Sequence, residues 1–394
     1  MKIENKKLEF LVKNQNITSS AQHPFDDVVC NFLEDLSKKL DDPKMNYEFP
    51  DIKALSFWCR KANIINLKKK NISSKIRIGL GVIFHVTPSN IPTNFMYSLI
   101  FGLLTGNSNV VKVPSKKFKQ IDFICKKINE LLEKKYKTLK KRISIIRYKE
   151  NDELTKSISL QCNARLIWGG DQTINTVRKI DLNPRALELT FSDRYSLSVI
   201  DSKSLNNKNK IFSLVEKFYN DTFVVDQNAC SSPQLILWHG KYNKIVQEKF
   251  WNLLAELVSK KYSPPENSTI EKYNQLCDNI ISSKNISSYK IYKNLIYIVS
   301  LSSLNKDTYK LRGKWGYFYE FNIKNLETLN KIVNTKFQTL SYYGLSRSYM
   351  ENFFRTANLE GIDRVVPVGQ ALDINLFWDG YDLNKILTRV IDVR

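Results

Sequence analysis

The strongest constraint on the fold is an alternation of two hydrophobic periodicities between residues 76 and 201. Short β-branched segments predict strands, and longer segments with apolar residues three or four positions apart predict helices. The predicted strands are 76–86, 109–113, 143–148, 164–168 and 197–201, and the predicted helices are 91–104, 115–136, 152–159 and 172–180. This alternation is typical of a parallel sheet that helices cover on both faces.

The two ends of the chain differ from each other. Near the N-terminus, the amphipathic segments 25–40 and 52–65 predict helices with no strand between them. Beyond residue 201, strands are predicted at 234–238, 295–299, 317–321 and 338–343, with a helix at 326–333. The sequence therefore predicts an α/β protein with two α/β domains and an N-terminal helical region.

The chain is strongly basic, with 61 lysines and arginines against 39 carboxylates in 394 residues and a formal net charge of +22. Such a charge is typical of proteins that bind nucleic acid or an anionic surface. The lysine runs, however, lie between core-forming segments, where solvated charge is expected. The charge by itself therefore leaves the partner open, and a hydrophobic fraction of 42% excludes a disordered chain.

The six cysteines are widely separated, without a CxxC pair or a cysteine–histidine cluster. Since there are only three histidines as well, neither a metal site nor a disulfide framework is expected. No stretch approaches the roughly 18–20 apolar residues of a transmembrane segment, and the N-terminus lacks the apolar part of a signal peptide. We therefore expect a cytoplasmic protein.

Two loops carry candidate functional residues. The turn 87–92 joins a buried strand to a buried helix, where ligands of open α/β sheets bind, and the amide of Asn90 can stabilise an oxyanion there. An isolated Asn-x-Pro also caps helices, which is the structural alternative for Asn90. Cys230 lies in a polar turn whose backbone amides can stabilise a thiolate, although a single loop cysteine is more often inert. Gly79 and Gly81 do not form a dinucleotide loop, because the third glycine is missing and the pair lies inside a predicted strand.

Six sequence blocks, in order, resemble the long-chain acyl-CoA reductase (LuxC-like) family of the aldehyde dehydrogenase superfamily. The blocks cover residues 81–116, 166–170 (LIWGG), 191–196, 228–234 (NACSSPQ), 337–344 and 361–383. The resemblance spans residues 75–394 and leaves the N-terminal helical region unmatched. Several blocks in a fixed order are much more specific than any single motif.

The resemblance implies an aldehyde dehydrogenase-like fold with a Rossmann-like parallel-sheet cofactor domain and an α/β catalytic domain. We expect an N-terminal helical region over 1–74 that packs on the cofactor domain, an NAD(P)-binding domain over 75–190 and a catalytic domain over 191–373. The C-terminal segment 374–394 is expected to be structural and to contribute to a contact between subunits.

The resemblance also assigns roles to single residues. It makes Cys230 the nucleophile that accepts the acyl group, and it makes Asn90 the partner of the Cys230 backbone N–H in an oxyanion hole. Lys112 corresponds to the lysine that holds the adenosine ribose, and Gly169 to the glycine where the backbone approaches the cofactor phosphates. The expected cofactor-binding residues are Thr87, Pro88, Lys112, Ser115, Lys116, Gly169 and Gly170.

Two departures from the superfamily concern glutamates. Oxidising members carry a glutamate that activates water. An alignment that keeps residues 191–194 in register puts Thr190 at this position, whereas a shift of two residues puts Glu188 there. A missing general base suits a reductase, because hydrolysis of the acyl-enzyme would waste the activated acyl group. The stretch 365–370 also lacks the glutamate that positions the nicotinamide ribose in relatives.

The cofactor preference is inferred from one loop. Where NAD-using relatives carry a glutamate, this chain has Ser115, followed by Lys116 and Lys117. No carboxylate would repel a 2′-phosphate there, and two ammonium groups are close. The alternative is that these lysines are ordinary solvated residues at a helix start. A positive charge is unfavourable there because of the helix dipole, and this favours the interpretation that they bind a phosphate. The sequence therefore favours NADPH over NAD.

Together these inferences predict an NADPH-dependent acyl-CoA reductase that converts an acyl thioester, such as a fatty acyl-CoA, into an aldehyde. The expected donor is an acyl-CoA or an acyl-protein, with an acyl-protein synthetase as partner, and the chain is expected to form a homo-oligomer and to bind no nucleic acid. Two alternatives stay open. One is an oxidising NAD(P)-dependent aldehyde dehydrogenase with Glu188 as base, and the other is a non-catalytic basic binding protein on the same scaffold.

Overall fold

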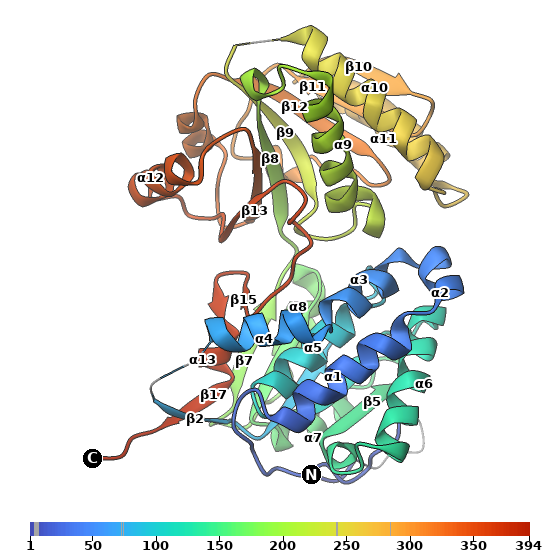
Figure 1. Cartoon of the computed structure of the whole chain (residues 1–394), viewed down its shortest axis with the longest axis vertical. Helices are drawn as coiled ribbons and strands as arrows, with labels where there is room; N and C mark the ends of the chain where they lie inside the picture. The colour runs from blue at the N-terminus through green and yellow to red at the C-terminus, as the bar shows by residue number, and fades with distance from the viewer. Residues whose placement is uncertain (4–7, 72, 74, 242, 284) are drawn as a thin grey trace. The chain divides into compact units, whose positions relative to one another are not determined.

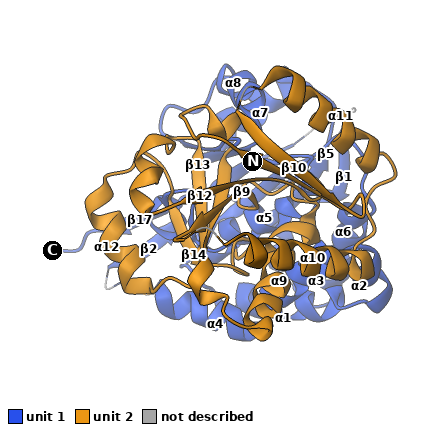
Figure 2. Ribbon diagram, turned by 90° about the horizontal axis from the view of Figure 1, so that it is seen from above, with its two compact units in different colours: residues 1–193, 374–394 blue, residues 194–373 orange. Residues whose placement is uncertain are grey.

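The computed structural model describes residues 1–3, 8–71, 73, 75–241, 243–283 and 285–394. The chain forms two compact units, which are coloured separately in Figure 2. Unit 1 comprises Met1–Asp193 and Ile374–Arg394, and unit 2 comprises Arg194–Asp373. The C-terminal segment therefore belongs to the same unit as the N-terminus. The expected boundary at residue 74 falls on a residue outside the described ones.

Unit 1 is built on a six-stranded sheet with the order β1-β5-β4-β3-β6-β7, of which Figure 1 labels β5 and β7. Its strands are β1 (Glu9–Val12), β3 (Val82–Val86), β4 (Ser108–Val113), β5 (Ile143–Arg147), β6 (Ala164–Trp168) and β7 (Leu187–Phe191). The described pairs are parallel except β1 with β5, which confirms the predicted α/β class. The chain proceeds from β3 to β5 on one side and then continues with β6 and β7 on the other. The strand order thus reverses between β3 and β6, beside which ligands of such sheets bind.

Helices cover both faces of this sheet. The helical segments of unit 1 are α1 (Asp27–Leu40), α2 (Pro43–Glu48), α3 (Pro50–Trp58), α4 (Lys61–Lys70), α5 (Asn94–Leu104), α6 (Lys119–Lys134), η1 (Leu139–Arg142), α7 (Asp152–Gln161), α8 (Asp171–Arg178) and α13 (Leu383–Ile386). Apolar side chains of α1, α3, α5 and α6 belong to one core cluster, and those of α7 and α8 belong to another. Alternate residues of β3 contribute to the two clusters, because successive side chains of a strand point to opposite faces.

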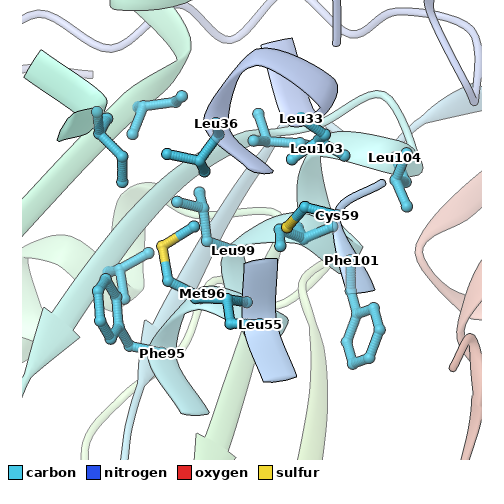
Figure 3. Close-up of a cluster of buried hydrophobic side chains, with 14 of the residues drawn as sticks. Leu33, Leu36, Leu55, Cys59, Phe95, Met96, Leu99, Phe101, Leu103 and Leu104 are labelled. Carbon is cyan, nitrogen blue, oxygen red and sulfur yellow. The ribbon is translucent and has the colours of Figure 1, made fainter. Parts of the chain in front are cut away.

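Helix α5 lies within the larger cluster because it is apolar on nearly every side. Phe95, Met96 and Leu99 are at most 1% exposed. Figure 3 shows them beside Leu36 of α1 and Leu55 of α3. Burial of one such side chain contributes roughly 1.5–3 kcal/mol, so α5 firmly anchors the turn that precedes it.

The single strand expected over 76–86 is wrong, because the structure has two strands, β2 (Ile76–Gly79) and β3. The break includes Gly81, whose φ of 134° is a conformation that residues with side chains rarely adopt. Strand β2 leaves the large sheet and pairs antiparallel with β17 (Thr388–Ile391). The two strands form one apolar run in the sequence, and only their different partners separate them.

Unit 2 contains a seven-stranded sheet with the order β10-β11-β12-β9-β8-β13-β14. Its strands are β8 (Tyr195–Asp201), β9 (Pro233–His239), β10 (Ile286–Tyr292), β11 (Ile296–Leu301), β12 (Tyr317–Ile323), β13 (Phe337–Tyr343) and β14 (Arg364–Pro367). The described pairs are parallel except β10 with β11. This sheet also agrees with the predicted α/β class.

Helices of unit 2 contribute to two core clusters. The helical segments are η2 (Ser202–Ser204), α9 (Lys208–Thr222), η3 (Phe223–Val225), α10 (Lys244–Lys261), α11 (Ser268–Ser282), η4 (Thr308–Lys310), η5 (Leu326–Lys331) and α12 (Arg347–Ala357). Side chains of α9 and α10 belong to one cluster, and those of α11, η5 and α12 belong to the other. The α-helix expected over 326–333 is the short 3-10 segment η5.

The C-terminal segment completes the core of unit 1. It forms a hairpin of β15 (Phe377–Trp378) and β16 (Tyr381–Asp382) before α13 and β17. The Trp378 side chain belongs to the same cluster as α5, and the Tyr381 ring meets the Phe191 ring edge-on with centroids 5.7 Å apart. This packing agrees with a structural role, and the expected contact between subunits stays a prediction.

Candidate functional site

Three of the expected cofactor-binding segments lie at the carboxyl edge of the unit 1 sheet. Thr87, Lys112 and Gly169 lie at the ends of β3, β4 and β6, which are neighbours in the sheet. The backbone N–H and the hydroxyl of Thr87 both donate to the carbonyl oxygen of Lys112, at 3.1 and 2.9 Å. The structure therefore brings Thr87 and Lys112 into direct contact beside the strand-order reversal.

The side chain of Lys112 is partly withdrawn from water. Its Nζ lies 4.9 Å from the centroid of the Tyr148 ring. Burial lowers the pKa of Lys112, and the charge of Glu150 opposes this effect. An ammonium group that has lost part of its hydration is well suited to hold a ribose hydroxyl or a phosphate, because the ligand supplies the missing acceptors.

Gly169 and Gly170 join β6 to α8. A Cβ at Gly169 would lie 3.2 Å from the side chain of Thr173, whereas a Cβ at Gly170 would meet nothing within 4 Å. Gly170 is the N-cap of α8 and gives the helix no side-chain cap. An uncapped helix start attracts anions such as phosphate, although Asp171 in the first turn opposes them.

Ser115 and Lys116 are exposed in the loop between β4 and α6. The Nζ of Lys116 lies 5.2 Å from the centroid of the Phe118 ring. Because α6 begins at Lys119, the expected position of these residues at the helix start is wrong, and the helix dipole has less bearing on them. The half-buried Pro88 belongs to the turn after β3.

The donor set at this edge fits a nicotinamide dinucleotide. It combines the ammonium group of Lys112 with the uncapped start of α8, on the two sides of β3. A dinucleotide carries ribose hydroxyls and a pyrophosphate, which match these two kinds of donor. The role of each residue in binding stays a prediction.

Asn90 is exposed in the turn between β3 and α5. The N-cap of α5 is Thr93, so the alternative in which Asn90 caps this helix is wrong. Asn90 belongs to unit 1 and Cys230 to unit 2, and their pairing in an oxyanion hole stays a prediction.

A chain of buried hydrogen bonds passes through His85 on β3. The Nδ1 of His85 lies 2.7 Å from the Ser98 hydroxyl, and its Nε2 lies 2.9 Å from Oδ1 of Asn109. The indole N–H of Trp168 donates to the same Ser98 oxygen at 2.9 Å. Burial lowers the pKa of His85 to about 4, so the ring is neutral at pH 7. His85 is therefore a hydrogen-bonded core residue, and it connects β3, β4, α5 and β6.

Cys230 lies in unit 2, in the turn that leads from α9 and η3 to β9. Asp226 and Gln227 in this turn have φ values of 55° and 59°, in the left-handed region. The side-chain amide of Gln227 donates to the carbonyls of Pro233 and Tyr317 at 3.2 and 3.0 Å. A buried side chain therefore holds the backbone just before Cys230 in a conformation that costs energy in isolation.

The main chain of Cys230 is anchored as well. Its carbonyl oxygen accepts a hydrogen bond from the Ser196 hydroxyl at 2.6 Å, and the Thr339 N–H donates to that hydroxyl oxygen at 3.1 Å. Cys230 therefore connects to β8 and β13 through one serine. These contacts fix the position of the residue within unit 2.

Four of the other cysteines are disfavoured as nucleophiles by burial. Burial raises the thiol pKa of Cys30, Cys59, Cys125 and Cys162, and a raised pKa lowers the thiolate fraction. Cys277 on α11 is partly exposed, as Cys230 is. Cys277 is therefore the natural comparison for Cys230.

The sequence analysis missed Asp221, a buried carboxylate in the last turn of α9. Its Oδ2 and Oδ1 accept hydrogen bonds from the N–H groups of Gly369 and Ala371 at 2.7 and 2.9 Å. Its main-chain oxygen accepts the Ser232 hydroxyl at 2.7 Å. Burial raises the pKa of Asp221 to about 7. The signal in the sequence was an acidic residue three positions after Phe218, on the apolar face of the helix.

Glu188 lies on β7, and its carboxylate is engaged by two arginines. It accepts from Nε of Arg165 at 2.8 Å and from Nε of Arg178 at 3.1 Å, and it also forms an ion pair with the Arg165 Nη2. Arg165 is 1% exposed and is the register partner of Glu188 on β6. These contacts give Glu188 a structural role. Thr190 is partly buried on the same strand, opposite Ile167.

The described residues also bear on metal binding and on membrane insertion. No group of three or more His, Cys, Asp or Glu side chains there is arranged to hold a metal ion. No helix within the same residues combines the length and apolar character needed to cross a membrane.

The sequence matches a known protein family. The family described as acyl-CoA reductase (LuxC) matches residues 51–290, which is more than half of the chain. No curated protein matches significantly.

Solved structures of aldehyde dehydrogenases share the fold. Lactaldehyde dehydrogenase from Escherichia coli has a TM-score of 0.58 and 10% identity, covering 86% of this chain and 78% of its own. Aldehyde dehydrogenase 21 from Physcomitrella patens, in complex with the reaction product succinate, has a TM-score of 0.60 and 9% identity over 92% and 84%. A variant of 1-pyrroline-5-carboxylate dehydrogenase from Thermus thermophilus has a TM-score of 0.61 and 10% identity over 94% and 81%. At such low identity these similarities describe the fold alone.

Proposed function

Because this chain belongs to the LuxC family of acyl-CoA reductases, we propose that it reduces an acyl thioester to an aldehyde through a covalent acyl intermediate on Cys230. The family match carries the reaction class. The position of Cys230, partly exposed in a turn that Gln227 and Ser196 hold in place, supports its role as the nucleophile.

The first step is the transfer of the acyl group to the enzyme. The Cys230 thiolate attacks the carbonyl carbon, a new C–S bond forms, and the thioester bond to CoA breaks as CoA leaves and takes up a proton. The side-chain amide of Asn90 and the backbone N–H of Cys230 are the proposed donors to the oxyanion. Each donor of this kind stabilises the transition state by roughly 3–4 kcal/mol.

The second step needs a reduced nicotinamide cofactor, which when bound would supply a hydride to the acyl carbon. The C–S bond to Cys230 then breaks, so that the aldehyde leaves and the Cys230 thiolate is restored. Lys112 would hold the adenosine ribose, and Gly169 and Gly170 would let the phosphates approach the start of α8. We propose NADPH rather than NADH, because the exposed loop has Ser115 and Lys116 where a carboxylate would repel a 2′-phosphate.

The surroundings of Glu188 favour the reductase over the oxidising alternative. A general base must reach water near the acyl-enzyme with a free lone pair. The Glu188 carboxylate instead bonds to Arg165 and Arg178. The family resemblance supports the finer proposals of an acyl-CoA or acyl-protein donor, an acyl-protein synthetase partner and a homo-oligomer. The proposed cytoplasmic location rests on the sequence pattern of the cysteines and of the N-terminus.

Mass spectrometry of the intact protein tests the nucleophile. The protein is incubated without NADPH with acyl-CoAs of increasing chain length, so that the acyl-enzyme accumulates. We expect an acyl adduct on the wild type and on the Cys277→Ala control, and none on Cys230→Ala. Adducts that persist in Cys230→Ala and disappear in Cys277→Ala would reject Cys230, and no adduct with any donor would reject the covalent mechanism.

A further inference from the structure

A pocket of about 400 Å³ lies in unit 1 beside α4, β2 and α13. Figure 1 shows these three elements at one corner of the unit. Strand β2 leads into the amino end of β3, so the pocket lies toward the edge of the sheet opposite to Thr87 and Lys112. Its volume is within the roughly 300–1,000 Å³ of small-molecule sites.

The walls of this pocket carry positive charge. Lys68, Lys75, Arg77 and His23 line it, and no acidic side chain is among its described lining residues. Asp27, which does not line the pocket, pairs with Lys68: its Oδ1 lies 3.2 Å from the Nζ of Lys68, on a side chain that is 89% exposed. The lining therefore favours an anionic ligand.

Arg77 is fixed in place by the C-terminal segment. Its Nε donates to the Thr388 hydroxyl at 2.7 Å, and its Nη2 donates to the Lys385 carbonyl at 2.7 Å. Lys75, by contrast, is exposed. The pocket thus combines a cation that the protein holds in position with one that can adjust to a ligand.

A buried acceptor without a partner also lines the pocket. Asn384 on α13 is 5% exposed, and its Nδ2 donates to the Asn71 carbonyl at 3.2 Å. Its Oδ1 is buried and has no hydrogen-bond partner among the described residues. Buried amide oxygens are nearly always paired, and a ligand N–H or O–H would supply the donor that this oxygen lacks.

The remaining wall is apolar. Phe25 is 5% exposed, and its backbone N–H donates to the Leu104 carbonyl at 2.7 Å, which ties this segment to the end of α5. Ile76 on β2 is 49% exposed, and Pro24 lines the pocket beside Phe25. Apolar surface next to cations and an acceptor suits a ligand with both a ring and a charged group.

We propose that this pocket binds a phosphorylated ligand of the size and chemistry of a nucleoside monophosphate. The phosphate lies against Lys75 and Arg77, the ring lies against Phe25 and Ile76, and a ring N–H or a sugar O–H donates to Asn384. The site is separate from the cofactor-binding edge and does not depend on the proposed function.

Isothermal titration calorimetry of the full-length protein at low ionic strength tests this proposal, with adenosine monophosphate as the probe. We expect Lys75→Ala to weaken binding by about tenfold or more, the usual loss for one charge-assisted contact. The matched control is Lys69→Ala, which removes the same charge from an exposed residue of α4 that does not line the pocket. This control should bind as the wild type does.

A second variant tests the donor to Asn384. Asn384→Leu should weaken binding of adenosine monophosphate by about tenfold and leave the affinity for inorganic phosphate unchanged. If this variant does not fold, the affinity of Lys75→Ala for adenosine monophosphate decides whether the pocket is the binding site. The proposal is overturned if the wild type does not bind adenosine monophosphate, or if Lys75→Ala and Lys69→Ala lose affinity equally. It is also overturned if Lys112→Ala lowers the affinity and Lys75→Ala does not, because the nucleotide then binds at the cofactor-binding edge.

Discussion

The carboxyl edge of the unit 1 sheet and the Cys230 turn of unit 2 are positioned by different means. At the unit 1 edge, Thr87, Lys112 and Gly169 lie together because their strands are neighbours. In unit 2, the Cys230 turn is held by hydrogen bonds to residues that are distant in the sequence, such as the bond from Gln227 to Tyr317.

This difference predicts how each region responds to mutation. An edge defined by backbone topology tolerates the loss of one side chain, because the strands remain in place and only a ligand contact is lost. A turn defined by buried side chains loses its geometry when one of them changes, since the left-handed backbone then has no support. The following predictions test this contrast.

The largest expected effect is an opposite pH dependence of stability at the two regions. Asp221 has a pKa of about 7 in the folded chain, above its ordinary 3.8, so its contribution is complete below pH 3.8 and is lost as the pH rises to about 7. His85 has a pKa of about 4, below its ordinary 6.5, so its contribution is complete above pH 6.5 and is lost as the pH falls to about 4. Each change amounts to at most about 4 kcal/mol.

In the wild type the two effects oppose each other between about pH 4 and 6.5. Urea unfolding measures the difference in the free energy of unfolding between each variant and the wild type. This difference should rise with pH for Asp221→Asn and fall with pH for His85→Gln. Parallel pH profiles for both variants would contradict the assignment of the two groups.

The second prediction concerns turnover. The Asp221 carboxylate accepts two backbone N–H groups, whereas the amide of Asp221→Asn can accept only at its oxygen. The loop around Gly369 should therefore shift, and with it the part of the Cys230 turn that contains Ser232. A displacement of about 1 Å at a reacting group costs on the order of a hundredfold in rate. We expect kcat for acyl-CoA reduction to fall by about this factor while KM stays nearly constant.

The matched control for this experiment is Asp226→Asn. Asp226 is also partly buried near Cys230, but among the described residues its Oδ1 accepts from the Tyr262 hydroxyl alone, at 2.5 Å, and an amide oxygen can do the same. This control should keep most of its activity. Equal losses in the two variants would show that Asp221 has no special role in positioning the turn.

At the unit 1 edge, Lys112→Ala should raise KM for NADPH by about ten- to thirtyfold, the cost of one charge-assisted contact. Because the strands do not depend on this side chain, kcat and the melting temperature should change little. Steady-state kinetics and thermal unfolding provide the measurements. A collapse of kcat with an unchanged KM would contradict a role in cofactor binding.

Ser115→Glu should shift the cofactor preference from NADPH towards NADH by about tenfold, because the new carboxylate repels a 2′-phosphate and can accept from ribose hydroxyls. The ratio of kcat/KM for the two cofactors measures the shift. Gln120→Glu makes the same change of charge five positions later, on α6, and serves as the control. If both variants shift the ratio equally, general electrostatics rather than a specific contact determines the preference.

The smallest effect on activity is expected for Glu188→Gln. This change weakens the ion pairs with Arg165 and Arg178 and should lower the free energy of unfolding by about 1–3 kcal/mol. The reductase activity of the folded variant should remain close to that of the wild type. A large loss of activity without a loss of stability would instead support the oxidising alternative with Glu188 as base.

Much of the fold was predictable from local sequence patterns. The strands β4, β5, β6 and β9 lie within about two residues of their predicted positions, because periods of two and of about 3.6 reflect which side chains face a core. The segment 76–86 was not predictable in this way, since β2 and β3 look alike in sequence and differ only in their partners. Strand β1 was not predictable either, because it depends on antiparallel pairing with β5, which is distant in the sequence.

The sequence by itself determined the α/β class, the family and the candidate residues Cys230, Asn90 and Lys112, because hydrophobic periodicity and motif spacing are local properties of the chain. Only the tertiary structure decided that Glu188 pairs with Arg165 and that Asp221 holds the segment around Ala371, 150 residues further along the chain. Contacts of this kind depend on which strands become neighbours and which side chains are buried together. That information belongs to the packed core as a whole and not to any single segment.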